Sequence, residues 1–253
     1  MNLHLSGKHV LITGSSKGIG RCIAEAFLLE GCKVAINGRH PSQLSDALKN
    51  IDHENAIAIA GDVSKPADAR RILDEFISTF GHLDILVCNV GSGQSVPPGE
   101  ETLEEWQRVF EQNLWSTTTM VEACRHELAR SLGSIVCISS ICGHEVVLGA
   151  PITYSAAKAA LNAYVRGSAR PLGKLGIRIN AISPGNILFD ESSWDRKQKD
   201  SPEAVDEMLR REVALARLGT PSSISNLALW LASPSANFTT GSIFVADGGQ
   251  LRA

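Results

Sequence analysis

The feature that most constrains this chain is the segment 10–20, in which a short apolar run passes through a glycine-rich turn into a periodic helix. Val10, Leu11 and Ile12 are typical of a strand that is buried on both faces of a parallel sheet. In the turn that follows, glycines would let a ligand approach the free N–H groups and the positive dipole end of a helix. The segment therefore predicts a phosphate-binding turn, with a plain tight turn as the alternative.

The same alternation of strand and helix continues to the end of the chain. We expect strands at 10–12, 33–37, 56–60, 83–88, 134–139, 178–183 and 242–245, and helices at 19–29, 41–51, 66–80, 102–131, 154–173 and 221–232. No internal repeat or linker interrupts this order. We therefore predict one α/β domain over residues 1–253, a doubly wound parallel sheet of about seven strands with helices on both faces.

The segment 190–211 departs from the pattern, because 12 of its 22 residues are charged. It follows the carboxyl end of the sixth expected strand, and Pro202 is placed to open a short helix. The segment is either a solvated insertion or a lid that closes over a site. We favour a substrate lid over residues 187–215.

Composition excludes several classes of function. The net charge of −3 gives no basic footprint for nucleic acid, and no apolar run is long enough to span a bilayer. The N-terminal residues lack a signal-peptide pattern, so we expect a cytoplasmic protein. The six cysteines form no Cys-x-x-Cys pair, which favours reduced thiols over disulfides or zinc. The seven histidines lack metal-ligand spacing, so we expect no metal site; His144 is the only one near the expected active site.

Tyr154 and Lys158 are the first candidates for chemistry. They are four residues apart on an expected helix and therefore share one face. A free tyrosine has a pKa of about 10, and a nearby ammonium group should lower it towards acid/base work. The alternative is a solvent-facing pair on an amphipathic helix. Ser140 favours the catalytic interpretation, because it ends the fifth strand at the same sheet edge as the glycine turn.

A family resemblance rests on an ordered set of motifs. Thr13-Gly14-x-x-x-Gly18-Ile19-Gly20, Asn89-x-Gly91, Asn113, Ser140 and Tyr154-x-x-x-Lys158 together resemble the short-chain dehydrogenase/reductase family. Asp62-Val63, Pro184-Gly185 and Asp247-Gly248-Gly249 extend the resemblance over nearly the whole chain. The resemblance implies a Rossmann fold that carries out hydride transfer between a nicotinamide cofactor and a carbonyl or alcohol.

The resemblance also implies the role of each site residue. Tyr154 would donate a proton to the substrate carbonyl oxygen, and Ser140, with Ser139 as its competitor, would hydrogen-bond that oxygen. Lys158 would hold the nicotinamide ribose, and Asn113 would anchor a water in the proton path. The interval from Ser140 to Tyr154 is one residue longer than usual in the family. The remaining cofactor-binding residues would be Gly14, Ser16, Lys17, Gly18, Ile19, Gly20, Arg39, Asp62, Val63, Asn89, Gly91, Pro184, Gly185 and Ile187.

The form of the cofactor follows from charge. The second expected strand ends in Asn37-Gly38-Arg39, without the carboxylate that binds a ribose 2′-hydroxyl. Arg39 and Lys17 together favour a 2′-phosphate, so we expect NADP(H) rather than NAD(H). The alternative is two unrelated surface cations. Phe189 stands near the place of a threonine that commonly contacts the cofactor in the family.

Three functions stay open from the sequence. The first is reduction of a carbonyl, or oxidation of the matching alcohol, with a small-molecule or carrier-borne substrate; the resemblance is greatest to 3-oxoacyl-carrier-protein reductases. The second is a sugar or polyol oxidoreductase, and the third is a non-catalytic NADP(H)-binding regulator. The resemblance also implies a homotetramer that joins through the helices carrying Asn113 and Tyr154 and through the C-terminal strand. The apolar residues Val121, Leu128, Leu161 and Val165 fit either that interface or packing within one subunit.

Overall fold

A computed structural model describes residues 2–252, and its centre is a single parallel sheet. The strands are β1 (His9–Ile12), β2 (Lys33–Gly38), β3 (Ala56–Ala60), β4 (Ile85–Cys88), β5 (Ser134–Ile138), β6 (Arg178–Pro184) and β7 (Ile243–Ala246). They lie in the order β3-β2-β1-β4-β5-β6-β7, and all their pairings are parallel. The predicted α/β fold of about seven strands is confirmed.

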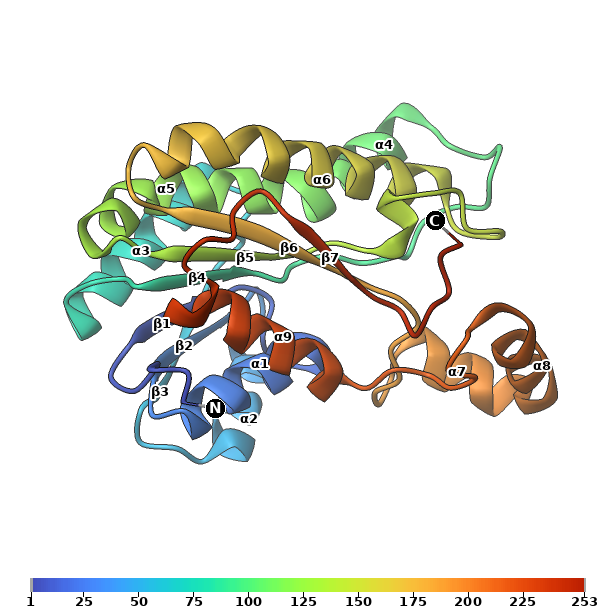
Figure 1. The fold of residues 1–253 in the computed structure, drawn as a ribbon, viewed down its shortest axis with the longest axis horizontal. Helices are drawn as coiled ribbons and strands as arrows, with labels where there is room; N and C mark the ends of the chain where they lie inside the picture. Colours follow the sequence, from blue (N-terminus) through green and yellow to red (C-terminus); the bar gives the residue numbers. More distant parts are fainter. Residues whose placement is uncertain (1, 253) are drawn as a thin grey trace.

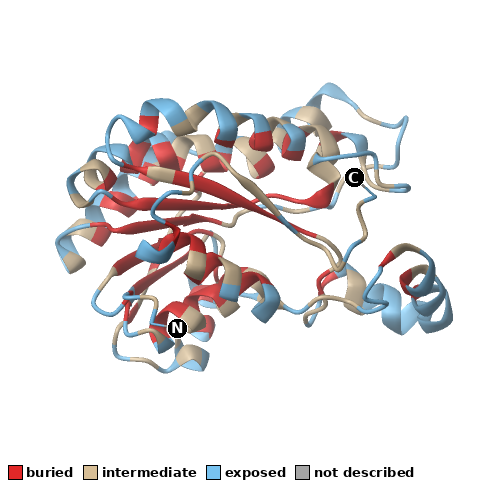
Figure 2. Cartoon of the chain, viewed as in Figure 1, coloured by how far each residue is buried: buried red, intermediate tan, exposed pale blue. Residues whose placement is uncertain are grey.

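Helices cover both faces of this sheet (Figure 1). One face carries α1 (Gly18–Leu29), α2 (Pro41–Ile51) and α9 (Pro221–Ala232), which pack with the sheet in one apolar cluster. The other face carries α3 (Pro66–Phe80), α4 (Leu103–Phe110), α5 (Ser116–Ser131) and α6 (Ile152–Gly173). Figure 2 shows the central strands as almost continuously buried, as their apolar sequences require, whereas the edge strands β3 and β7 are only partly buried.

The expected helix over 102–131 is not continuous. A π-helical turn, η1 (Glu111–Trp115), separates α4 from α5 and contains the buried Asn113. A π-turn adds one residue to a helical turn and is frequent at functional sites. The interruption therefore changes the direction in which Asn113 projects, which helical periodicity alone does not predict.

The four residues considered for a subunit interface pack inside the subunit instead. The exposed fractions of Val121, Leu128, Leu161 and Val165 are 3%, 0%, 1% and 0%, and all four belong to the core beneath α5 and α6. Of the two alternatives that the sequence left open, packing within one subunit is the one that the structure shows, because these faces of the helices are covered by the sheet.

The charged segment after β6 forms two helices, α7 (Ser193–Asp200) and α8 (Pro202–Glu212). Figure 1 shows both lying beyond the edge at which β6 ends. Val205, Leu209 and Val213 give the pair a small apolar core of its own. Backbone hydrogen bonds join the two ends of this helix pair: Leu188 N donates to Gly219 O at 2.9 Å, and Gly219 N donates to Asn186 O at 2.8 Å. We refer to residues 187–215 as the lid segment.

Within residues 2–252, no helix combines the length and the apolar character needed to cross a membrane.

Candidate active site

The glycine turn lies where the strand order reverses, between β1 and β4. Asn89, after β4, donates from Nδ2 to Gly14 O at 2.7 Å and to Thr13 O at 3.2 Å. Thr13 Oγ1 in turn accepts from Asn89 N at 3.0 Å. Gly14 has a φ of +62°, and a Cβ there would lie 2.8 Å from Val90 Cγ2, so only glycine fits. The strand ends are thus locked together at the crevice where doubly wound sheets bind ligands.

The amino end of α1 is built to receive an anion. The residue before it, Lys17, has extended backbone, and no side chain caps the helix at this position. The first N–H groups of a helix have no intrahelical acceptor, and the dipole makes that end positive. Gly18 has a φ of +58°, a left-handed conformation that favours glycine.

Gly91 fills a narrow space between two functional side chains. A Cβ at this residue would lie 2.9 Å from Asn113 Oδ1 and 3.0 Å from Lys158 Nζ. Asn113 and Lys158 therefore flank the same backbone position after β4. Both residues of the motif Asn89-x-Gly91 thus have a role. Asn89 holds the glycine turn by hydrogen bonds, and Gly91 allows Asn113 and Lys158 to lie close to the backbone.

The Asn113 side chain is saturated by backbone groups. Its Oδ1 accepts from Ser92 N at 3.0 Å, and its Nδ2 donates to Ser92 O at 3.1 Å and to Val109 O at 3.0 Å. These bonds hold the loop after β4 against η1. The amide of Asn113 thus positions the backbone of this loop.

The two serines after β5 face different surroundings. Ser139 Oγ donates to Asn162 Oδ1 at 2.6 Å and is committed to the core. Ser140 Oγ accepts from Cys142 N at 3.2 Å, and Ser140 is close enough to the Tyr154 hydroxyl to act on its pKa. The structure thus brings Ser140, and not Ser139, to the tyrosine.

The pKa of Tyr154 shifts opposite to the expected direction. Burial of the hydroxyl raises this pKa to about 12, while the hydrogen bond with Ser140 acts to lower it. Desolvation disfavours the phenolate more than the neighbouring groups favour it. Tyr154 therefore holds its proton at neutral pH in this structure.

Lys158 is a buried cation beside the tyrosine. Its Nζ lies 5.8 Å from the centroid of the Tyr154 ring and donates to Ile138 O at 2.9 Å. The residue is 2% exposed, and burial lowers its pKa to about 8. Removing the ammonium from water is only partly offset by the carbonyl, so Lys158 gives up its proton more easily than a surface lysine.

The end of β2 lies beside the glycine turn and has an unmatched acceptor. The Asn37 side chain donates to Ile59 O at 3.0 Å and to Gly61 O at 3.3 Å, whereas its buried Oδ1 has no donor among the described residues. Ser16 Oγ lies 3.7 Å from where a Cβ on Gly38 would stand. Arg39 is exposed and forms no ion pair within residues 2–252. The uncapped amino end of α1, the glycines of the turn and the unpaired Asn37 Oδ1 together fit a phosphate-bearing nucleotide.

The other expected cofactor residues lie at the same edge. Asp62 Oδ1 accepts from Ser64 N at 3.0 Å and from Ser64 Oγ at 2.7 Å, so it closes a local turn, while Lys65 precedes α3 as its cap residue. Val63 beside it is buried. Pro184 and Ile187 are buried after β6, and Gly185 N donates to Ala246 O at 3.0 Å.

Two residues of the lid segment lie against the glycine turn: Phe189, which the sequence placed near the cofactor, and Glu191, which it did not identify. A Cβ on Gly18 would lie 2.6 Å from the Phe189 ring, and Lys17 Nζ lies 3.2 Å from Glu191 Oε2. The partners of this ion pair are 174 positions apart. The only local pattern in this part of the sequence is the helix-cap spacing of Ser192 and Asp195, and that pattern does not indicate a contact with the glycine turn.

His144 ties the loop after Ser140 to the end of β6. Its Nε2 lies 3.0 Å from Ser183 Oγ, and burial lowers its pKa, which favours the neutral ring. The residue as a whole stays exposed.

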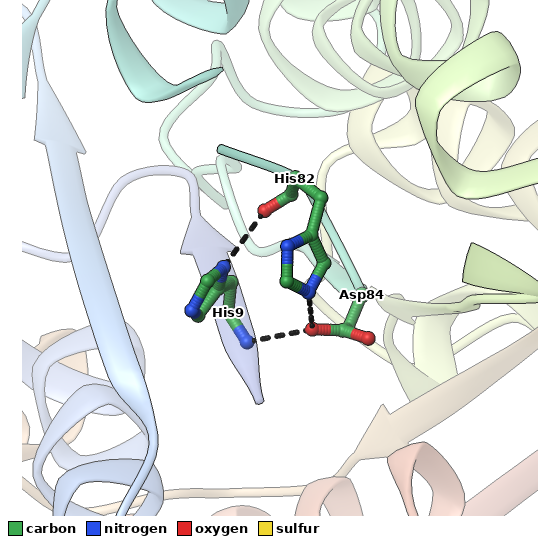
Figure 3. Close-up of side chains that lie close together, drawn as sticks. All are labelled: His9, His82 and Asp84. Atoms are coloured by element: carbon green, nitrogen blue, oxygen red, sulfur yellow. Dashed lines mark hydrogen bonds and ion pairs between the residues drawn. The ribbon is translucent and has the colours of Figure 1, made fainter. Parts of the chain in front are cut away.

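A separate group of titratable residues lies at the opposite end of the strands (Figure 3). His9, His82 and Asp84 bring potential metal-ligand atoms within 4.8 Å of one another, which residue spacing could not indicate. Asp84 accepts from His9 N at 2.9 Å and from Lys8 Nζ at 2.9 Å, and lies 3.2 Å from His82 Nε2. The Lys8 ammonium already balances the carboxylate, so these contacts account for the group as a clamp between β1 and β4.

Comparisons with known proteins agree with this arrangement. The family described as enoyl-(acyl carrier protein) reductase matches residues 14–250. Glucose 1-dehydrogenase 2 of Bacillus subtilis is 33% identical, over 97% of this chain and 95% of that protein. The crystal structure of L-sorbose reductase from Gluconobacter frateurii, complexed with NADPH and L-sorbose, has 29% identity and a TM-score of 0.93 over the full length of both chains. A short-chain type dehydrogenase/reductase from Mycobacterium marinum has 30% identity and a TM-score of 0.87, over 100% of this chain and 98% of that one. The chain belongs to the short-chain dehydrogenase/reductase family of oxidoreductases.

Proposed function

We propose that this protein is an NADP(H)-dependent oxidoreductase that reduces the carbonyl group of a sugar to the matching alcohol, with Asn113, Ser140, Tyr154 and Lys158 as its reactive set. The observation that carries the proposal is that Ser140, Tyr154 and Lys158 lie together: Ser140 acts on the pKa of Tyr154, and Lys158 Nζ lies 5.8 Å from the centroid of the Tyr154 ring, one helical turn further along α6. A purely regulatory NADP(H)-binding protein has no need of a proton donor beside a buried cation.

Because its pKa is raised, Tyr154 is protonated at neutral pH and can act as the proton donor when the reaction runs as a reduction. A phenol that holds its proton at neutral pH can give it to a substrate oxygen as that oxygen becomes an alkoxide. Ser140 would donate a hydrogen bond to the same oxygen and fix its position. The bound nicotinamide supplies the hydride for the carbonyl carbon.

Lys158 would stabilise the phenolate that remains after proton transfer. It is charged below its pKa of about 8, and its burial strengthens the attraction. Asn113 reaches the opposite side of Gly91, so a water held there would connect the lysine to solvent. The reprotonation path that the family resemblance implies therefore has its protein groups in adjacent positions.

The cofactor would lie along the glycine turn. The open end of α1, with Gly14, Ser16, Gly18, Ile19 and Gly20 around it, would hold the pyrophosphate. Arg39 and Lys17 would pair with a 2′-phosphate, and Asp62 and Val63 would border the adenine. Asn89 and Gly91 would line the middle, and Pro184, Gly185 and Ile187 would border the nicotinamide.

The substrate class rests on the relatives. A glucose dehydrogenase and a sorbose reductase both match the full length of this chain, which favours a polyhydroxylated substrate. A 3-oxoacyl thioester is the second candidate, because Val146 and Leu148, in the loop after Ser140, are each 95% exposed and could contact an acyl chain. We also propose that residues 1–253 form one domain with a lid at 187–215. A homotetramer in the cytoplasm stays a prediction.

The test is NADPH consumption with a panel of carbonyl substrates. L-sorbose and other ketoses should be reduced, and acetoacetyl thioesters should be reduced more slowly. If the thioester were turned over faster than the ketoses, a 3-oxoacyl thioester would replace the sugar as the proposed substrate. Absence of turnover with every carbonyl, combined with tight NADPH binding, would favour the regulatory role.

A further inference from the structure

The structure places a lid carboxylate on the cation that is expected to meet the cofactor phosphate. Lys17 Nζ and Glu191 Oε2 are 3.2 Å apart. We propose that Glu191 is a selectivity residue that occupies Lys17 in place of a 2′-phosphate, so that NADP(H) has to displace it whereas NAD(H) does not. This inference rests on the proposed function, because it concerns the same cofactor site.

Lys17 stands at the position where an anion is most favoured. It immediately precedes α1, in extended conformation, at a helix end that no side chain caps. The carboxylate of Glu191 therefore pairs with the ammonium group of the residue from which this helix begins. A phosphate group would be drawn to the same ammonium group and to the positive end of the helix.

The backbone around Glu191 holds the carboxylate there. Glu191 has a φ of +64°, in the left-handed region, and its N–H donates to Asp195 Oδ2 at 3.0 Å. Ser192 follows, 6% exposed, and its Oγ accepts from Asp195 N at 3.0 Å to cap α7. The carboxylate is therefore presented by a hydrogen-bonded bend and not by a loose loop tip.

Phe189 fixes the same bend from the other side. Its ring packs on Gly18, so the backbone of the lid segment already touches the glycine turn. Ser192 N donates to Phe189 O at 3.0 Å, which joins the two contacts into one unit. Displacing Glu191 from Lys17 would thus loosen the beginning of the lid segment.

The size of the effect follows from exposure. The Lys17 and Glu191 side chains are 66% and 78% exposed, so water and salt screen the pair. Exposed ion pairs of this kind change an equilibrium by about two- to fivefold. A 2′-phosphate with nearly two negative charges competes with this pair, whereas a 2′-hydroxyl has no charge with which to compete.

The experiment measures cofactor affinity in matched variants. NADPH and NADH are titrated into the wild type, Glu191→Gln and Glu207→Gln, with cofactor fluorescence as the readout. Glu207 is an exposed lid residue in α8 that forms no ion pair with any described residue, so its variant matches the charge change. We expect Glu191→Gln to tighten NADPH by about two- to fivefold and to leave NADH unchanged, and Glu207→Gln to change neither.

A double variant and a second readout complete the test. In a Lys17→Met background, Glu191→Gln should no longer affect NADPH. Hydrogen exchange at residues 189–195 should rise with adenosine 2′,5′-bisphosphate and not with adenosine 5′-monophosphate. An unchanged NADPH affinity in Glu191→Gln, or equal gains for both cofactors, would overturn the inference and leave the proposed function standing. If the wild type bound neither cofactor, both would fall.

Discussion

Replacing Lys158 by methionine should make the protein more stable at neutral pH while removing its activity. The lysine is 2% exposed, and its pKa of about 8 lies well below the 10.5 of an unperturbed lysine. Keeping this group charged in the folded protein at pH 7 therefore costs about 3 kcal/mol. Methionine keeps most of the volume and loses the bond to Ile138 O, worth about 1 kcal/mol. We expect a net gain of about 2 kcal/mol in the free energy of unfolding.

The lowered pKa of Lys158 makes the stability of the wild type depend on pH. Between pH 8 and about 10.5 the unfolded lysine still binds its proton while the folded one has lost it, so wild-type stability rises with pH in that window. The variant lacks that rise. Near pH 10 the wild type should have recovered about 2.5 kcal/mol relative to the variant, so that the gap of about 2 kcal/mol has closed.

Urea unfolding at pH 7 and near pH 10 measures both values. Lys174→Met is the matched control, because Lys174 is an exposed lysine just after α6. It should change stability by less than about 0.5 kcal/mol at either pH. A Lys158→Met protein that is less stable at pH 7, with a gap that does not change with pH, would refute the account of a strained buried cation.

Two further predictions concern the cofactor and the substrate oxygen. Arg39→Asp should raise the KM for NADPH about tenfold or more and leave the KM for NADH nearly unchanged, since a charge-assisted phosphate contact is lost; equal changes would remove the assignment of a 2′-phosphate site. Ser140→Ala should lower kcat by about a hundredfold, because one donor to the reacting oxygen is lost. Ser139→Ala should mainly lower stability, because Ser139 donates a hydrogen bond to the buried Asn162. If Ser139→Ala lowered kcat and Ser140→Ala lowered only the melting temperature, the roles assigned to the two serines would be reversed.

Much of the fold was predictable because its information is local. The apolar run before Gly14 and the periodic residues after Gly18 determine a strand and a helix without reference to the rest of the chain. The repeated alternation then predicts a parallel sheet. The carboxyl ends of parallel strands share one edge, so the sequence could also indicate that Ser140, Asn89 and the glycine turn lie together.

What the sequence could not predict depends on contacts between distant segments. The pKa of Tyr154 is set by how completely α6 and its neighbours exclude water, and two residues at helical spacing carry no information on that. The Lys17–Glu191 ion pair depends on how the lid segment turns back over α1. Likewise, the π-turn at Asn113 is a small change in helical geometry that leaves no apolar period to read.

The central claim is that Tyr154 donates the proton in a nicotinamide-dependent reduction. The measurement is steady-state reduction of L-sorbose, or of the best substrate from the panel, by the wild type and Tyr154→Phe at saturating NADPH. The variant keeps the ring and loses only the hydroxyl, so NADPH affinity should stay within about twofold while kcat falls by about a hundredfold or more. A variant with wild-type kcat across the active substrates would contradict the account.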